Sequence, residues 1–159
     1  MAVTGKSAIP VVPGVRKVSP LVTGAPEASA QTNPRGAIAV MTAGFVASAA
    51  TGCPTSIYGF FADVGQNLAT DGAANGGFYR ADSGEEKAFV AVLDGVWSSS
   101  FRNATAALSM NTAGVVVLKT GTAVSASSNV RMQEVKYGFT VGDTNPIVSF
   151  VVLAAAVQV

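Results

Sequence analysis

The chain has 159 residues, ten Lys and Arg, nine Asp and Glu, a formal net charge of +1 and no His. Charged residues make up only 12% of the sequence, about half the usual share, whereas hydrophobic residues make up 49%. The near-zero charge gives no global attraction to nucleic acid or anionic lipid. The absence of His excludes Ser-His-Asp and Cys-His catalysis and every metal site that contains His.

Residues 1–36 are predicted to form an extended arm. Five of the seven prolines, at positions 10, 13, 20, 26 and 34, lie in this segment. Because proline fixes φ and lacks an N–H donor, the segment suits neither a helix nor a central strand. The stretch "IPVVPGVRKVSPLV" is too apolar for a solvated linker, which favours docking on a neighbouring subunit over disorder. The expected anchors are Ile9, Val12, Val15, Arg16, Lys17 and Leu21.

The uncharged stretch "AIAVMTAGFVASAATGCPTSIYGFFA", residues 37–62, is long enough to cross a membrane, which takes about 20 apolar residues. It contains no Leu and is punctuated by Gly44, Gly52, Pro54 and Gly59, which argues against one continuous helix. Short apolar runs bounded by turn residues are typical of strands. We therefore predict strands in "AIAVMT", "GFVASA" and "SIYGFFA", with a turn at "ATGCPT".

The middle of the chain is expected to continue as short strands separated by turns. "TDGAANGG" (70–77) is a predicted loop, and "FYRA" and "KAFVAVLDG" are predicted strands on either side of the turn "DSGEE". "GVVVLKTGTAV" (114–124) is predicted to be a tight hairpin or a strand that ends at Gly121.

One short helix is predicted over residues 98–110, "SSSFRNATAALSM". A Ser at the N-cap precedes Phe101, Ala104, Thr105 and Leu108, which follow helical spacing. No other segment shows such spacing. We therefore expect an all-β fold, a compact β-barrel or sandwich over residues 37–159, preceded by the extended arm and holding at most this one helix.

The chain is predicted to close with a β-hairpin, in which "NVRMQEVKYGFTV" leads through "GDTNP" to "IVSFVVLAAAV". Apolar residues alternate from Val135 to Val141, one step out of phase with Val130 and Met132, so Gln133–Glu134 is an expected β-bulge. The second arm is apolar on both faces, which indicates a central strand or one covered by a neighbouring subunit.

Groups that can titrate or coordinate a metal are few. Glu85 and Glu86 are adjacent, so on a strand they would point to opposite faces, and a solvated turn suits them better. The single cysteine, Cys53, forms no intrachain disulfide and is expected to pack beside a turn. The glycine-rich loop "DGAANGG" lacks the Lys-Ser/Thr pair of a phosphate-binding loop. Four aspartates near a glycine are expected to make turns: Asp71, Asp82, Asp94 and Asp143. We therefore expect no enzyme, no catalytic residue, no cofactor and no metal.

Two stretches of turn and strand sequence carry a resemblance to known proteins. They are "PTSIYGFFADVGQN" (54–67) and "VRMQEVKYGFTVGDTNPIVSFVVLA" (130–154), together about a quarter of the chain. They resemble the phrases "P-T-x-I-Y-G-x-A-x-x-x-G-x-N" and "V-x-V-x-G-F-x-D-x-V-G-D-T-N-G-R-V" of small tailed-bacteriophage virion proteins of the capsid decoration or cement type. Pro146 stands where that group has Gly, which changes the turn at this position.

The resemblance implies a non-enzymatic virion protein that decorates and stabilises a capsid by bridging major capsid subunits. Its partners would be the phage major capsid protein and further copies of itself, as a homotrimer, with no nucleic acid and no membrane. It would be made in the host cytoplasm and lie on the outer capsid surface; prolines also interrupt any signal-peptide core near the first residues. The charge-poor composition agrees, because an uncharged surface tends to be covered by partners.

Two other functions remain open at this point. A tail-tube or head–tail connector protein would also be β-rich and assembled, although the chain offers no long insertion for stacking rings. A carbohydrate-binding surface module would use exposed aromatic residues, for which Trp97, Tyr79 and Tyr58 are the candidates. Trp97 follows a turn, and we expect it at the edge of the core rather than as a stacking platform.

Overall fold

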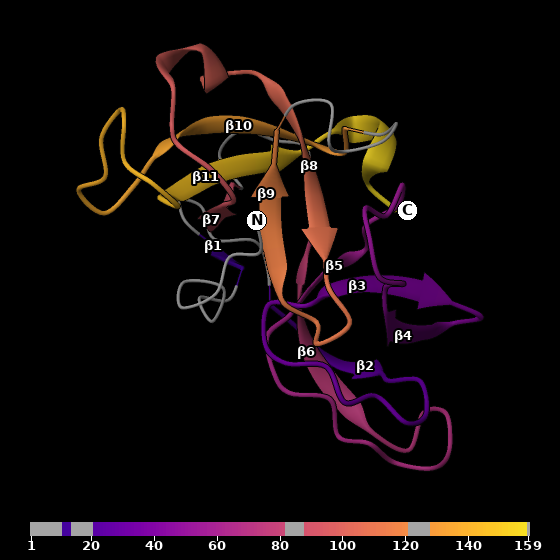
Figure 1. Ribbon diagram of the computed structural model, residues 1–159. Helices are drawn as coiled ribbons and strands as arrows, with labels where there is room; N and C mark the ends of the chain where they lie inside the picture. The colour runs from indigo at the N-terminus through magenta and orange to yellow at the C-terminus, as the bar shows by residue number, and fades with distance from the viewer. Residues whose placement is uncertain (1–10, 14–20, 82–87, 121–127, 159) are drawn as a thin grey trace.

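Two β-sheets account for nearly all the regular structure of the protein, a computed structural model that describes residues 11–13, 21–81, 88–120 and 128–158 (Figure 1). The six-stranded sheet has the order β1-β7-β11-β10-β8-β9. Its strands are β1 (Val12–Pro13), β7 (Phe89–Leu93), β8 (Thr105–Met110), β9 (Val116–Lys119), β10 (Val130–Val135) and β11 (Ile147–Val152). The five-stranded sheet has the order β2-β6-β5-β3-β4. Its strands are β2 (Leu21–Pro26), β3 (Ile38–Thr42), β4 (Phe45–Ser48), β5 (Gly59–Phe61) and β6 (Asn75–Arg80).

The six-stranded sheet closes into a barrel. β7 pairs with β11 along one edge and, in parallel, with β9 along the other, with Val92 opposite Val117 and Leu93 opposite Leu118. Closure removes the free edges that an open sheet would expose. The expected all-β fold with a barrel is therefore confirmed.

The five-stranded sheet starts from a tight hairpin. β3 and β4 are joined by Ala43 and Gly44, whose φ values of 51° and 86° give the two left-handed residues of a type I′ turn. Further on, β5 pairs with β3 and β6. The three strands predicted in residues 37–62 are thus confirmed, and no described helix has the length and hydropathy to span a membrane.

One apolar core joins the barrel to the second sheet. The ring of Phe60, from β5, lies 4.7 Å from that of Phe89 and 6.0 Å from that of Phe150, which belong to the barrel strands β7 and β11. All three side chains are fully buried. The two sheets therefore pack as parts of one core, and the barrel does not stand alone.

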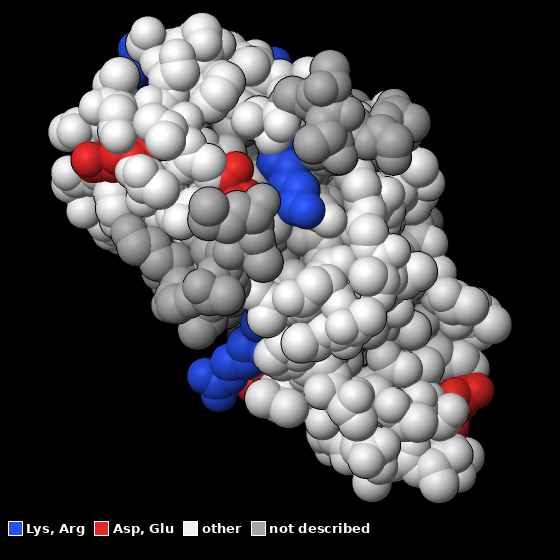
Figure 2. Space-filling view, viewed as in Figure 1, with Lys and Arg blue, Asp and Glu red and all other residues white. Residues whose placement is uncertain are grey.

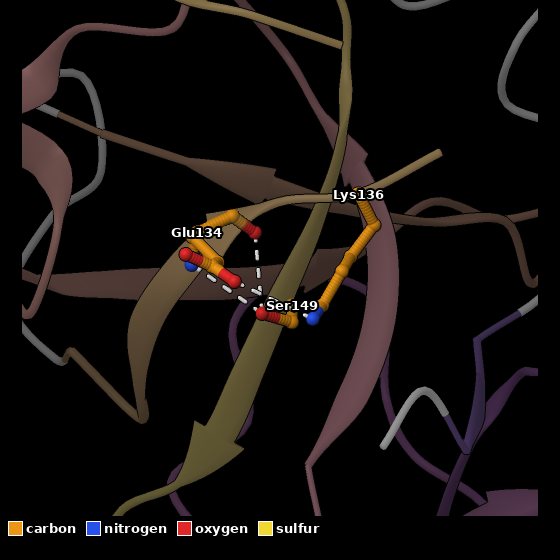
Figure 3. Close-up of polar contacts among 3 residues, drawn as sticks. All are labelled: Glu134, Lys136 and Ser149. Atoms are coloured by element: carbon orange, nitrogen blue, oxygen red, sulfur yellow. Dashed lines mark hydrogen bonds and ion pairs between the residues drawn. The ribbon is translucent and has the colours of Figure 1, made fainter. Parts of the chain in front are cut away.

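The predicted closing hairpin and its bulge are confirmed. β10 pairs with β11, and the register shifts between Met132 and Val135. The Ser149 hydroxyl occupies this irregularity: it donates to the Glu134 carbonyl at 3.2 Å and accepts from the Glu134 N–H at 3.3 Å (Figure 3). Ser149 thus bonds the backbone groups of the bulged residue, which the ladder leaves without strand partners. β11 lies in the middle of its sheet, as its apolar sequence predicted.

Three local predictions were wrong at least in part. The loop predicted over 70–77 ends before Asn75, where β6 begins. The helix expected over residues 98–110 is a short 3-10 turn, η2 (Ser99–Phe101), followed by β8, because pairing with β9 and β10 outweighs a weak helical pattern. Ser98 does cap η2, since its side chain accepts from the Ser100 N–H. The alternation from Val135 to Val141 does not continue β10 either: Tyr137 has φ 58°, so the chain turns there into a loop over 136–146.

The segment expected to be an extended arm contributes two strands to the sheets of its own chain. β1 pairs with Phe89 and Val90 of β7, and β2 pairs with β6. β2 lies at an end of its sheet, where a strand that contains proline is tolerated. Just after β2, Glu27 forms a parallel bridge with Val46 of β4, so residues 21–36 belong to the folded body.

Candidate interaction surfaces

Two of the six predicted arm anchors lie among the described residues. The backbone of Val12 pairs with Val90 in the six-stranded sheet, and that of Leu21 pairs with Tyr79 in the five-stranded sheet. The structure therefore places these two on different sheets of the same chain. Ile9, Val15, Arg16 and Lys17 lie outside the described residues.

Two of the aspartates expected at turns accept hydrogen bonds from the backbone. Asp71 Oδ1 accepts from the Ser29 N–H at 2.7 Å, and Asp143 Oδ2 accepts from the Thr140 N–H at 2.8 Å. Among the described residues, no three His, Cys, Asp or Glu side chains gather in a way that could hold a metal ion. Asp82, Glu85 and Glu86 lie outside the described part of the chain.

Cys53 is half-buried beside Pro54, where burial raises the pKa of its thiol. A raised pKa reduces the thiolate fraction near neutral pH, and the thiolate is the reactive form. The environment of Cys53 therefore suits packing better than nucleophilic chemistry.

The aromatic residues expected to serve a carbohydrate site are covered or engaged. Trp97 is only 2% exposed, and its ring meets that of Phe101 edge-on at 5.8 Å. The Arg80 guanidinium lies over the Tyr58 ring, with its Cζ atom 4.0 Å from the ring centroid. Trp97 therefore offers no exposed ring on which a sugar could stack. This agrees with the expectation that Trp97 packs against the core.

Five large hydrophobic side chains among the described residues are exposed: Val64, Leu68, Val96, Tyr137 and Val141. Tyr137 and Val141, exposed by 69% and 61%, lie on the loop that joins β10 to β11. This loop is tied to the segment after β7, because the Trp97 carbonyl accepts from the Gly142 N–H and Asp143 accepts from the Trp97 N–H. The apolar side chains are thus carried on a hydrogen-bonded loop that extends from one end of the barrel (Figure 1).

Charged side chains are sparse on the surface. The face in Figure 2 is mostly uncharged, with Lys, Arg, Asp and Glu in small, separate patches. One described ion pair, between Lys136 Nζ and Glu134 Oε1 at 3.5 Å, lies at the exposed side of the bulge (Figure 3). Among the described residues drawn on this face, charges of one sign do not gather into a large patch.

A polar groove of 390 Å³ lies where the two sheets meet. Its walls come from three segments, the chain after β2, the end of β4 and the β8–β9 turn, and its lining residues fall in 30–33, 48–51 and 110–114. Gly52 and Met110 join the sheets beside it through two backbone hydrogen bonds of 2.8 and 2.9 Å. Its volume is in the range of small-molecule and peptide sites.

Two side-chain amides that the sequence analysis did not single out hold backbone segments together. Asn129 Oδ1 accepts from the Leu108 N–H at 2.7 Å, and its Nδ2 donates to the carbonyls of Leu108 and Pro54. Gln158 accepts from the N–H of Met41 and donates to its carbonyl, both at 2.8 Å. Each amide thus bonds both the backbone N–H and the backbone carbonyl of one residue, as a neighbouring strand does in a β-ladder. No local sequence pattern distinguishes these two amides from amides that bond only to water.

No family model matches the chain, and comparisons with curated proteins and with solved structures find no match either.

Proposed function

We propose that the protein is a non-enzymatic virion structural protein that decorates a phage capsid and stabilises it by bridging major capsid subunits. Further copies of the chain, arranged as a trimer, would complete each bridging unit on the outer capsid surface.

The exposed apolar loops are the observation that carries the proposal. Of the five exposed large hydrophobic side chains, Val64, Tyr137 and Val141 lie within the two phrases that resemble decoration proteins, and Leu68 directly follows the first phrase. Apolar side chains held outward on loops, on a surface with few charges, suit a large protein contact better than free exposure to water.

The N-terminal residues would add a second contact. An arm tied to a folded body makes its binding effectively intramolecular, so modest interfaces gain avidity. Because β1 and β2 both pair with strands of the same chain, the contact would be made by residues outside these two strands, which include Ile9, Val15, Arg16 and Lys17.

A binding assay on capsids tests the proposal. The purified protein is mixed with heads of a phage that lack it, and the bound fraction is measured by co-sedimentation. The paired substitutions Tyr137→Ser and Val141→Ser should reduce binding at least tenfold, and Arg16→Glu with Lys17→Glu should reduce it less. Asn103→Gly, at an exposed turn residue with φ 64° that glycine accommodates, is the matched control and should bind normally.

Absence of binding by the unchanged protein would refute the proposal. Negative-stain images of the purified protein distinguish the main rival, since rings or tubes would indicate a tail-tube or head–tail connector protein. Any truncation must end before Val11, because Val11 is buried in the core and β1 and β2 both pair with strands of the same chain.

A further inference from the structure

Tyr137 combines a strained backbone with an exposed aromatic side chain. It has φ 58° and Gly138 has φ 81°, while the Phe139 N–H donates to the Lys136 carbonyl at 3.3 Å. These are the features of a type I′ turn, whose first central position favours Asn or Gly over a bulky side chain. The Tyr137 side chain is 69% exposed, so packing within its own chain offsets little of this cost. Backbone strain of this kind is typical of a functional position.

Two segments at this end of the barrel form one unit, which we call the barrel-end unit: residues 94–97 after β7 and residues 134–146 around the β10–β11 loop. Val96 makes an antiparallel bridge with Thr144, which brings the first segment against the second. Val96 is 51% exposed and Val141 is 61% exposed. Together with Tyr137, they give the barrel-end unit three exposed apolar side chains.

The barrel-end unit is held in shape by its own hydrogen bonds. The Asn145 N–H donates to the Gly95 carbonyl at 2.7 Å, and Asn145 Oδ1 accepts from the Gly95 N–H at 3.1 Å. Within the loop, Asp143 Oδ2 accepts from the Thr140 N–H at 2.8 Å. A surface that is already ordered loses less entropy on binding. The unit therefore presents its apolar side chains at little entropic cost.

The charges of the barrel-end unit indicate the chemistry of its partner. The unit carries one basic side chain, Lys136, and three acidic ones, Asp94, Glu134 and Asp143. Lys136 pairs with Glu134, so the two aspartates give the unit an excess of negative charge. An acidic surface favours a partner that carries Lys or Arg beside its own apolar contact. It disfavours an anionic lipid surface, which attracts basic residues.

We propose that Tyr137 is the anchor of the contact with the major capsid subunit, and that its ring enters an apolar pocket with Lys or Arg at the rim. This inference rests on the proposed function, and it adds which side chain dominates the affinity and what kind of pocket accepts it. Tyrosine suits the role because it buries a large, rigid ring while its hydroxyl keeps a hydrogen-bond partner. Val96 and Val141 pack around the mouth of the pocket and exclude water from it.

Capsid binding and thermal stability of one variant test the inference together. Tyr137→Asn relieves the strain of the turn and removes the ring, so it should raise Tm while weakening binding to phage heads by about tenfold or more. Tyr137→Phe keeps the ring and should retain most of the binding. Val64→Ser removes an exposed apolar side chain outside the barrel-end unit and should weaken binding less. A lower Tm for Tyr137→Asn, or a loss of binding no larger than that of Val64→Ser, would overturn the inference.

A matched pair of charge changes tests the acidic surface. Asp143→Asn keeps an oxygen that can accept from the Thr140 N–H but removes the charge, so it should weaken binding several-fold at low salt and less at high salt. Asp71→Asn makes the same change at a carboxylate that accepts from the Ser29 N–H, and should leave binding unchanged. Equal effects of the two substitutions would contradict a basic rim that faces the barrel-end unit.

Two further measurements detect other occupants. Sedimentation of the free protein would overturn the inference if it shows an oligomer that Tyr137→Asn dissociates, because another copy then covers the ring. Binding to vesicles of phosphatidylcholine and phosphatidylglycerol that Tyr137→Asn abolishes would overturn it in favour of lipid. If the unchanged protein does not bind heads at all, the proposed function fails and this inference with it. If it binds and Tyr137→Asn binds equally well, only this inference fails.

Discussion

The barrel and the five-stranded sheet are held together by different kinds of contact. The barrel strand β7 is buried along its whole length, β11 nearly so, and backbone pairing closes the sheet on itself. The five-stranded sheet relies on polar contacts from outside its ladder. Gln158 binds Met41, Gln31 binds Ser48, and Arg80 donates to the carbonyls of Tyr58 and Gln158.

This difference indicates where the protein opens first. Apolar burial inside a closed ladder is lost only on global unfolding, whereas a hydrogen bond from a half-buried amide can break locally. We expect slow hydrogen exchange in β7 and β11 and faster exchange at the outer strands of the second sheet. The shared core around Phe60 is the exception, because it ties the stability of one region to the other.

The largest effect is expected from breaking that link. Phe60→Ala empties a fully buried ring position between the two sheets and should lower the free energy of unfolding by about 3–5 kcal/mol. Urea unfolding followed by tryptophan fluorescence measures it, since Trp97 is buried with the barrel. Phe45→Ala, at a half-buried residue of the β3–β4 hairpin, is the control and should cost much less. Equal losses for the two variants would contradict a core shared through Phe60.

A second change acts on the five-stranded sheet alone. A Cβ on Gly59 would collide with the backbone carbonyl of Tyr79 in the paired strand β6. Backbone atoms of a paired strand cannot move aside as the end of a flexible side chain can. Gly59→Ala should therefore lower the free energy of unfolding by about 1–3 kcal/mol. Chemical denaturation measures the loss, with Gly138→Asn as the control. Gly138 has φ 81° and no atom within 4 Å of such a Cβ, so Asn fits there at little cost. A Gly59→Ala variant as stable as the parent would show that β5 and β6 separate easily.

The sequence predicted the apolar strands well and the polar connections hardly at all. "AIAVMT" and "GFVASA" became β3 and β4, and the phase break before Val135 located the bulge, because apolar periodicity reports directly on burial. The helix prediction over residues 98–110 failed because the continuous apolar run Ala106–Leu108 fits a buried strand as well as a helix. Pairing partners distant in the sequence decided between them.

The candidate surfaces could be predicted only in part. The burial of Trp97 followed from its place beside a turn, but the roles of Asn129 and Gln158 did not. An amide in the sequence carries no sign of whether its partner is water, another strand or a ligand. The polar groove forms from residues in 30–33, 48–51 and 110–114, which are not adjacent in the sequence, so local patterns contain no trace of it.

A smaller effect is expected at the bulge, where the barrel, as at Asn129, uses a polar side chain in the way that the second sheet does. Ser149→Ala removes the hydroxyl that bonds the Glu134 N–H and carbonyl, and should cost about 1 kcal/mol. Glu134→Gln removes only the ion pair with Lys136, whose two side chains are 52% and 31% exposed, and should be nearly neutral. Thermal unfolding of the two variants separates the contacts drawn in Figure 3. A larger loss for Glu134→Gln would mean that the ion pair, not Ser149, stabilises the bulge.

The smallest and most local effect is expected at Gln158. Gln158→Met keeps the length of the side chain but removes both hydrogen bonds to Met41. Met41 lies in β3 beyond Ala39, the last residue of this strand that pairs with β5. Because Gln158 is only half-buried, water can replace these bonds, so Tm should hardly change. Exchange of the Met41 N–H should nevertheless become several-fold faster, since that group has lost its acceptor, while exchange of the Leu108 N–H in the barrel should stay the same. Equal acceleration at Met41 and Leu108 would mean that both regions open together, and the contrast between barrel and sheet would then fail.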